Sequence, residues 1–177
     1  MAEQLSLKVI KGTYLSEQER CEVVALCSRA FETDYGAFLR EFSDATHILA
    51  RRQGDLVSHA LWITRWLQPE GLPPLRTAYV EAVATAEAYR GRGYATVVMQ
   101  RLAQEIRDFE LGGLSPAERG LYLRLGWELW RGPLFIRTAA ELVPTPDEVV
   151  MILRLPQTPI LDLDAVLSAE WREGELW

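Results

Sequence analysis

Residues 79–95 join an apolar strand, a turn rich in glycine and arginine, and the start of a helix. Gly91 and Gly93 can adopt positive φ angles and let a ligand approach the backbone closely. The first N–H groups of the helix lack backbone partners, and its dipole favours an anion beside them. Arg90 and Arg92 add positive charge. The turn is therefore a candidate phosphate site, although a Gly-x-Gly pair alone is also typical of a plain surface turn.

Length and composition favour one domain. The chain has 177 residues, of which 49% are hydrophobic, so we expect a single domain over residues 1–177 with one sizeable core. The net charge of −6 argues against nucleic acid as a partner. Acidic side chains are frequent between residues 162 and 177. That segment suits a cationic partner, and it is equally typical of a solvated acidic tail.

The two cysteines, Cys21 and Cys27, lie six residues apart on one expected helix, so a disulfide between them is not expected. Reduced thiols are typical of the cytoplasm, which is the predicted location. The sequence contains no signal peptide and no apolar run of membrane length. Because that apolar run is missing, we expect no membrane partner. Neither cysteine nor histidine is spaced for zinc, so we expect no metal.

Hydrophobic periodicity and turn residues predict the elements that position this turn. Helices are expected at 16–31, where Ser16 and Glu19 form a capping box, and at 38–42, 93–109, 115–125 and 162–171. Strands are expected at 5–11, 47–52, 56–67, 77–84, 109–114, 127–130, 134–138 and 149–155. Gln53-Gly54-Asp55 predicts a hairpin turn. This order is typical of an α+β fold.

The turn resembles the acyl-CoA pyrophosphate loop of the GCN5-related N-acetyltransferases, and the order of elements extends the likeness over most of the chain. The resemblance implies an α+β fold with a mixed, mostly antiparallel sheet flanked by helices. It also implies acetyl-CoA as co-substrate. The residues expected to bind it are Arg90, Gly91, Arg92, Gly93, Tyr94 and Ala95 in the loop, with the backbone of Val83 and Thr85, where the Val83 N–H holds the oxyanion.

Acetyl transfer requires a base for the ammonium, a donor for the oxyanion and an acid for the departing thiolate. Alternation along the strand puts Glu81 on one face just before the turn, so Glu81 is the candidate base, directly or through a water, or else it only orients the amine. The family places a phenol near the sulfur, and Tyr122 is the matching residue. Taken alone, a tyrosine in this setting is more often a half-buried packing aromatic.

Several segments resemble the aminoglycoside 2′-N-acetyltransferases more narrowly, including Tyr79–Ala84, Gly126–Pro133, Thr145–Asp147 and the end Trp171–Trp177. The resemblance implies a cationic aminoglycoside as acceptor, antibiotic resistance and a homodimer. The acceptor is expected to contact Asp34, Glu81, Ala82, Asp147 and Trp177 with its terminal carboxylate.

A further aspartate of that family has no clear equivalent after Asp34, which leaves gentamicin-type and kasugamycin-type substrates open. Two other functions also remain open. One is N-acetylation of another small amine or polyamine, and the second is a non-catalytic acyl-CoA-binding module.

Overall fold

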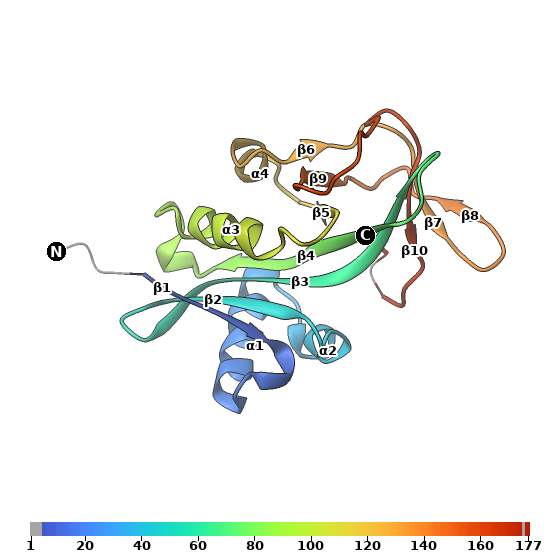
Figure 1. Cartoon of the computed structure of the whole chain (residues 1–177). Helices are drawn as coiled ribbons and strands as arrows, with labels where there is room; N and C mark the ends of the chain where they lie inside the picture. The colour runs from blue at the N-terminus through green and yellow to red at the C-terminus, as the bar shows by residue number, and fades with distance from the viewer. Residues whose placement is uncertain (1–4, 175) are drawn as a thin grey trace. The chain divides into compact units, whose positions relative to one another are not determined.

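A computed structural model describes residues 5–174 and 176–177 (Figure 1). Residue contacts divide the chain into two compact units, Met1–Ile63 with Val80–Gln104, and Thr64–Tyr79 with Glu105–Trp177. Strands β3 (Asp55–Pro69) and β4 (Leu75–Thr85) contribute residues to both units. Each unit is described in turn.

The first unit contains antiparallel strands with helices packed on them. Besides its parts of β3 and β4, its elements are β1 (Ser6–Lys11), the 3-10 turn η1 (Gly12–Tyr14), α1 (Glu17–Phe31), α2 (Tyr35–Glu41), β2 (Thr46–Arg52), η2 (Glu87–Tyr89) and α3 (Tyr94–Glu105). β2 pairs with both β1 and β3 in antiparallel registers. In Figure 1, α1 and α2 lie on one side of these strands and α3 lies on the other.

Local signals in the first unit have the geometry that the sequence predicts. The Ser16 hydroxyl accepts a bond of 3.1 Å from the Glu19 N–H, and the Ser16 N–H donates to the Glu19 carboxylate at 3.0 Å, which confirms the capping box. Gln53 and Gly54 have φ angles of 53° and 92°, as a two-residue hairpin turn requires. These contacts depend only on residues close together in sequence, which is why they could be predicted.

Strand β4 departs from regular geometry at Ala82. Its φ angle is 54°, a left-handed conformation that side chains other than glycine rarely adopt. Ala82 is buried at 5% exposure, while its neighbours Glu81 and Val83 are half-buried. The strand that should carry the candidate base is therefore distorted next to it.

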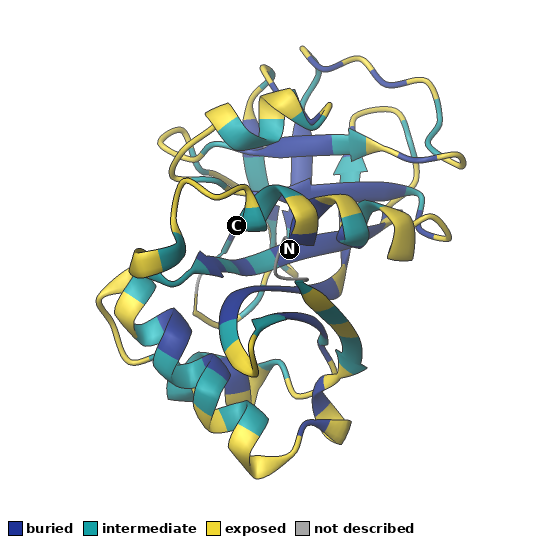
Figure 2. Cartoon of the chain, turned by 90° about the vertical axis from the view of Figure 1, so that its left-hand side faces the viewer, coloured by how far each residue is buried: buried dark blue, intermediate teal, exposed yellow. Residues whose placement is uncertain are grey.

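The second unit is rich in short strands. Besides its parts of β3 and β4, its elements are β5 (Leu111–Leu114), α4 (Gly120–Arg124), β6 (Glu128–Leu129), β7 (Leu134–Arg137), β8 (Leu142–Pro144), β9 (Met151–Arg154) and β10 (Leu167–Glu170). β5 pairs in parallel with β4, and β10 pairs in parallel with β7. The pairs β5–β9, β6–β9, β3–β10 and β7–β8 are antiparallel, so the sheet is mixed and mostly antiparallel. Figure 2 shows the strands largely buried and the outer faces of the helices exposed.

Three predicted helices differ most from the structure. The expected helix over 162–171 is wrong, because Leu167–Glu170 form strand β10, whose first three residues are buried between β3 and β7. The helix expected over 115–125 is confined to Gly120–Arg124, and the helix expected over 93–109 is α3, which ends at Glu105. β8 was not predicted. The partners of β10, β3 and β7, come from distant parts of the chain, and a local pattern contains no information on them. β8 is three exposed residues that pair with the preceding strand β7, and so short a segment has no clear alternation.

A close backbone approach at Gly132 gives a prediction for stability. A Cβ atom added there would lie 1.8 Å from the Ala165 carbonyl oxygen, whereas one added at Gly120 would meet nothing closer than 3.5 Å. We expect Gly132→Ala to lower the free energy of unfolding by ~3 kcal/mol or more, because backbone must move. Gly120→Ala, the matched control, should raise it by about 0.5 kcal/mol. Urea titrations of both variants measure this, and equal stabilities would contradict the packing at Gly132.

Candidate active site

The glycine turn has a geometry that suits an anion. Gly91 and Gly93 have φ angles of 75° and 79°, and a Cβ atom at either position would meet no atom within 4 Å. Glycine is thus required there by backbone conformation, and the turn is open on its outer side. Helix α3 begins directly after Gly93, so its first N–H groups face this open space.

Aromatic and cationic side chains surround the same turn. The guanidinium carbon of Arg92 lies 5.3 Å from the centre of the Tyr89 ring, and that of Arg52 lies 5.8 Å from it. The Tyr89 and Tyr94 rings are 6.2 Å apart. Arg90 donates from Nε to the Thr85 carbonyl at 3.4 Å and is otherwise exposed. These positive charges can contribute to binding a diphosphate.

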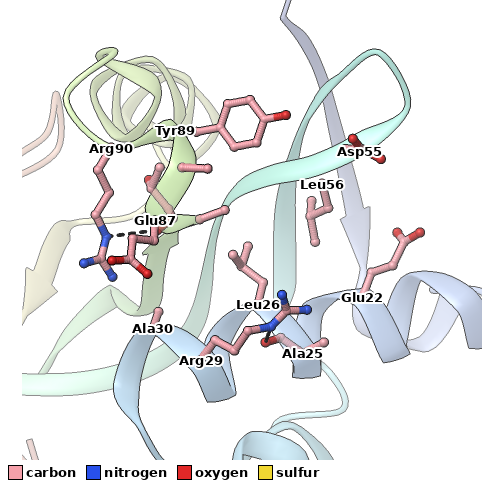
Figure 3. Close-up of a pocket in the computed structure, with 13 residues that line it drawn as sticks. Glu22, Ala25, Leu26, Arg29, Ala30, Asp55, Leu56, Glu87, Tyr89 and Arg90 are labelled. Atoms are coloured by element: carbon pink, nitrogen blue, oxygen red, sulfur yellow. Dashed lines mark hydrogen bonds between the residues drawn. The ribbon is translucent and has the colours of Figure 1, made fainter.

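A cavity of about 750 Å³ lies next to this turn within the first unit (Figure 3). One face of α1 forms one wall, with Leu26 and Arg29, and the stretch from Thr85 to Arg90 forms another. The volume is in the range of roughly 300–1,000 Å³ that small-molecule sites occupy. Two of the residues expected to bind acetyl-CoA, Thr85 and Arg90, therefore line a cavity of suitable size.

The expected acceptor residues of the first unit differ in their surroundings. Asp34 is exposed and caps α2, because its carboxylate accepts the Gly36 N–H at 2.8 Å. A structural role thus accounts for one oxygen of Asp34, and the other oxygen can bind a ligand. Glu81 is half-buried in β4 directly before the distorted residue Ala82.

Tyr122 lies in α4 of the second unit. Its ring packs edge-on against Trp127, with centres 6.1 Å apart, and burial raises the pKa of the phenol to about 12. The hydroxyl therefore keeps its proton at neutral pH, as a general acid must. The ring contact with Trp127 shows that Tyr122 packs, and its role as a general acid stays a prediction.

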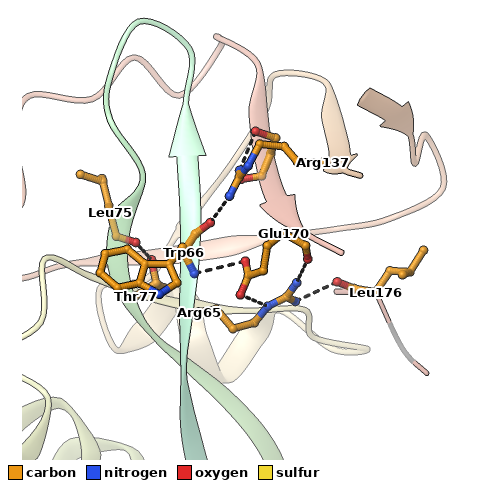
Figure 4. A network of polar contacts seen from close by, with 8 residues as sticks. Arg65, Trp66, Leu75, Thr77, Arg137, Glu170 and Leu176 are labelled. Carbon is orange, nitrogen blue, oxygen red and sulfur yellow. Dashed lines mark hydrogen bonds and ion pairs between the residues drawn. The ribbon is translucent and has the colours of Figure 1, made fainter. Parts of the chain in front are cut away.

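The C-terminal segment is fixed to the second unit by a buried arginine (Figure 4). Arg65 in β3 is 1% exposed and donates to the carbonyl oxygens of Leu176 and Glu170, both at 2.8 Å. Its guanidinium carbon lies 4.9 Å from the centre of the Tyr79 ring. The Glu170 carboxylate accepts from the Trp66 N–H at 3.2 Å and lies 3.5 Å from Arg65 Nε. Charge and hydrogen bonds of Arg65 are thus satisfied inside the protein.

Trp177 is itself held in place. The side chain is 4% exposed, and its indole N–H donates to the Thr145 hydroxyl at 2.8 Å. Thr145 in turn donates to the Leu134 carbonyl at 3.1 Å. Asp147 is exposed in the turn that follows Thr145. The structure therefore brings two of the expected acceptor residues, Trp177 and Asp147, to the same turn.

Sequence reasoning missed Arg65, His59 and Ser58, which hold these elements through buried hydrogen bonds. A signal for two of them was present. Val57, His59, Leu61, Ile63, Arg65 and Leu67 alternate along β3, and a polar residue in that otherwise apolar series must find a partner inside the protein. The identity of the partner could not be predicted, because it comes from other strands.

Two further findings concern the part of the chain that the structure describes. No helix within residues 5–174 has the length and apolar character needed to cross a membrane. Nor do three or more His, Cys, Asp or Glu side chains gather among the described residues in a way that could hold a metal ion.

Comparison with known families agrees with this geometry. Residues 13–130 match the acetyltransferase (GNAT) domain family, so the chain belongs to the GNAT acetyltransferases. It is also 36% identical over 156 residues to an aminoglycoside 2′-N-acetyltransferase of Mycolicibacterium fortuitum, with 80% of each chain covered. The α+β fold expected from the sequence is thereby confirmed.

Solved structures share the fold. The GNAT family N-acetyltransferase YhbS of Escherichia coli, determined in complex with CoA, superimposes with a TM-score of 0.70 at 18% identity and covers 98% of this chain and 92% of its own. An acyl-CoA N-acyltransferase of Pseudomonas aeruginosa gives a TM-score of 0.60 at 19% identity, and the match covers 84% of this chain and 99% of the acyltransferase. Other matching structures are longer. The chain spans 34% of a GCN5-related N-acetyltransferase from Kribbella flavida, with 73% of this chain covered, a TM-score of 0.56 and 21% identity.

The contact between Trp177 and Thr145 gives a prediction about the C-terminus. Thr145→Val removes the acceptor of the indole N–H, a loss of roughly 1 kcal/mol. We expect carboxypeptidase to release Trp177 about fivefold faster from this variant, because the end of the chain opens more often. Thr96→Val in α3 is the matched control and should leave the rate unchanged. An unchanged rate in Thr145→Val would contradict this anchoring of the C-terminus.

Proposed function

We propose that this protein transfers the acetyl group of acetyl-CoA to the 2′-amino group of an aminoglycoside, and that it thereby confers resistance to that antibiotic. The observation that carries the proposal is the anchored C-terminus, where the Trp177 indole binds Thr145, two residues before the exposed Asp147. The similarity to the Mycolicibacterium fortuitum enzyme supports the same acceptor. Within the proposal the enzyme acts as a homodimer in the cytoplasm.

Acetyl-CoA is the expected donor. Its diphosphate fits the open turn from Arg90 to Ala95, where glycine conformation, the start of α3 and two arginines all favour an anion. The pantetheine arm fits beside β4, where the N–H groups of Val83 and Thr85 can bind it as an added strand binds a sheet edge. β4 pairs with β5 from Thr77 to Tyr79, and β4 continues to Thr85 beyond this paired segment.

The reaction requires three groups acting in turn. Glu81, directly or through a water, accepts a proton from the substrate ammonium, and the free amine then attacks the thioester carbonyl carbon. The Val83 N–H stabilises the negative oxygen of the tetrahedral intermediate. As that intermediate collapses, the C–S bond breaks and Tyr122 gives its proton to the thiolate. The extra proton of the amine nitrogen passes through solvent to the phenolate, which leaves a neutral amide and a neutral phenol. The raised pKa of Tyr122 keeps that proton available.

The acceptor is expected to be cationic. The carboxylates proposed to bind its ammonium groups are those of Asp34, Asp147 and the chain terminus at Trp177, together with Glu81, while Ala82 contributes backbone. Charge-assisted hydrogen bonds to ionised amines are stronger than neutral ones, so a few such contacts can select a polyamine sugar.

A direct assay tests the acceptor. We expect thiol release from acetyl-CoA with gentamicin-type or kasugamycin-type compounds, and mass spectrometry should show a single acetyl group at the 2′ amine. A two-residue C-terminal extension moves the carboxylate and should raise the aminoglycoside KM about 10- to 100-fold, while the acetyl-CoA KM stays nearly constant. The same extension at the N-terminus is the control. Turnover of simple polyamines alone would favour a different acetyltransferase, and no turnover with any amine would favour a binding module.

Tyr122 is tested by removing its hydroxyl. Tyr122→Phe should lower kcat and kcat/KM together by ~10²-fold, because the proton is needed only as charge develops on sulfur. Since the pKa of the phenol is about 12, the pH profile between about pH 6 and 9 should keep its shape. Tyr14→Phe, at a residue that is 75% exposed, is the control. Activity within twofold of the wild type would make Tyr122 a packing residue.

A further inference from the structure

Both histidines of the chain are buried side by side in the first unit. His47 in β2 is 2% exposed, His59 in β3 is 0% exposed, and His47 Nδ1 lies 2.9 Å from His59 Nε2. His59 Nδ1 lies 2.9 Å from the carbonyl oxygen of Ala82, the residue with a positive φ angle. Burial lowers the pKa of His47 to about 4 and that of His59 to about 3, so both rings are neutral at pH 7.

One constraint determines which ring nitrogen of each histidine carries the proton. A carbonyl oxygen only accepts hydrogen bonds, so Nδ1 of His59 must carry the proton that it donates to Ala82. In a neutral ring Nε2 is then an acceptor, and His47 must donate to it from Nδ1. Cys27 lies beside the same ring, with its sulfur 3.7 Å from His59 Nδ1, and burial raises its thiol pKa to about 12.

Ser58 makes a parallel contact one residue earlier in β3. Its side chain is fully buried, and its hydroxyl donates to the Ala84 carbonyl at 3.0 Å. The Thr85 hydroxyl is 2.8 Å from Ser58 Oγ and must be the donor there, because Ser58 has only one proton. Two carbonyl groups of β4, at Ala82 and Ala84, are therefore bound by side chains of β3.

The direction of two N–H groups follows. In a trans peptide the C=O of one residue and the N–H of the next point in opposite directions. Because the carbonyls of Ala82 and Ala84 point to side chains of β3, the N–H groups of Val83 and Thr85 point away from β3. These are the two groups that the proposed function assigns to acetyl-CoA.

We propose that His59 and Ser58 are positioning residues that orient these two peptides before acetyl-CoA binds. His59 sets the Val83 N–H, which meets the oxyanion, and Ser58 sets the Thr85 N–H, which meets the pantetheine arm. Donors that are already oriented need no rearrangement during the reaction. The inference rests on the proposed acetyl transfer, but its structural part concerns the protein without ligand.

The first test uses the unliganded, full-length protein. Long-range ¹H–¹⁵N NMR spectra distinguish the two neutral tautomers of each histidine. We expect His59 to carry its proton on Nδ1 across neutral pH. A proton on Nε2 would mean that the bond to Ala82 does not exist, and it would overturn the proposal whether or not the protein acetylates any amine.

The second test removes the donor of His59. His59→Leu should shift the Val83 amide resonance and lower kcat about tenfold or more, with the acetyl-CoA KM changed less than threefold, because one oxyanion-hole donor is typically worth ~10²–10³ in kcat. In His59→Asn, whose amide N–H can occupy the place of Nδ1–H, most of this loss should be recovered. Cys27→Ala is the matched control, since it alters packing around the ring but leaves the bond to Ala82.

The remaining variant separates the two positioning roles. Ser58→Ala should raise the acetyl-CoA KM severalfold and affect kcat less than His59→Leu does. Should His59→Leu fail to fold, the tautomer of His59 in the wild-type protein still decides whether the bond to Ala82 exists. Equal kcat in His59→Leu and the wild type, or an equal loss in Cys27→Ala and His59→Leu, would reduce His59 to a packing residue. No turnover in the wild type would refute the acetyl transfer, and the NMR result would still stand.

Discussion

A buried strand residue with a left-handed backbone is the constraint around which the candidate site is organised. Ala82 pays a conformational cost of roughly 1–2 kcal/mol, and its carbonyl cannot remain unpaired in a buried strand. A ring nitrogen of His59 meets that carbonyl at 2.9 Å. The side-chain bond satisfies this carbonyl, and in the proposed function the neighbouring N–H groups bind the ligand.

In the second unit a buried polar side chain holds the C-terminal segment. Arg65 is almost fully buried, yet it binds backbone carbonyls of Glu170 and Leu176 and packs on Tyr79. Leaving such a charge without partners would cost several kcal/mol, so the C-terminal segment and Arg65 depend on each other. In both units a polar residue of β3 fixes an irregular segment that regular hydrogen bonding cannot hold.

In the proposed function these arrangements place the chemistry on backbone that is held by buried hydrogen bonds. The candidate base, Glu81, and the two proposed N–H donors belong to one strand, and the candidate diphosphate turn follows it within a few residues. Trp177 is held by a side-chain bond and by burial. Catalytic groups on fixed backbone lose little freedom when substrate binds, which favours precise orientation.

The sequence by itself determined what depends on neighbouring residues: the Ser16 capping box, the Gln53-Gly54 hairpin, the glycine turn before α3 and the α+β order of elements. The likeness of the loop also placed the chain in its family, the GNAT acetyltransferases. Local patterns sufficed there, because capping and turn conformations involve contacts only a few residues apart.

Only the tertiary structure decided the rest. Residues 167–170 form strand β10 and not a helix, because β3 and β7 supply hydrogen-bond partners that lie far away in sequence. The distortion at Ala82, its bond to His59 and the bond of Arg65 to Leu176 likewise join segments that no local pattern relates. A buried polar residue in a sequence signals that a partner must exist, but only the packing of distant strands determines which group that partner is.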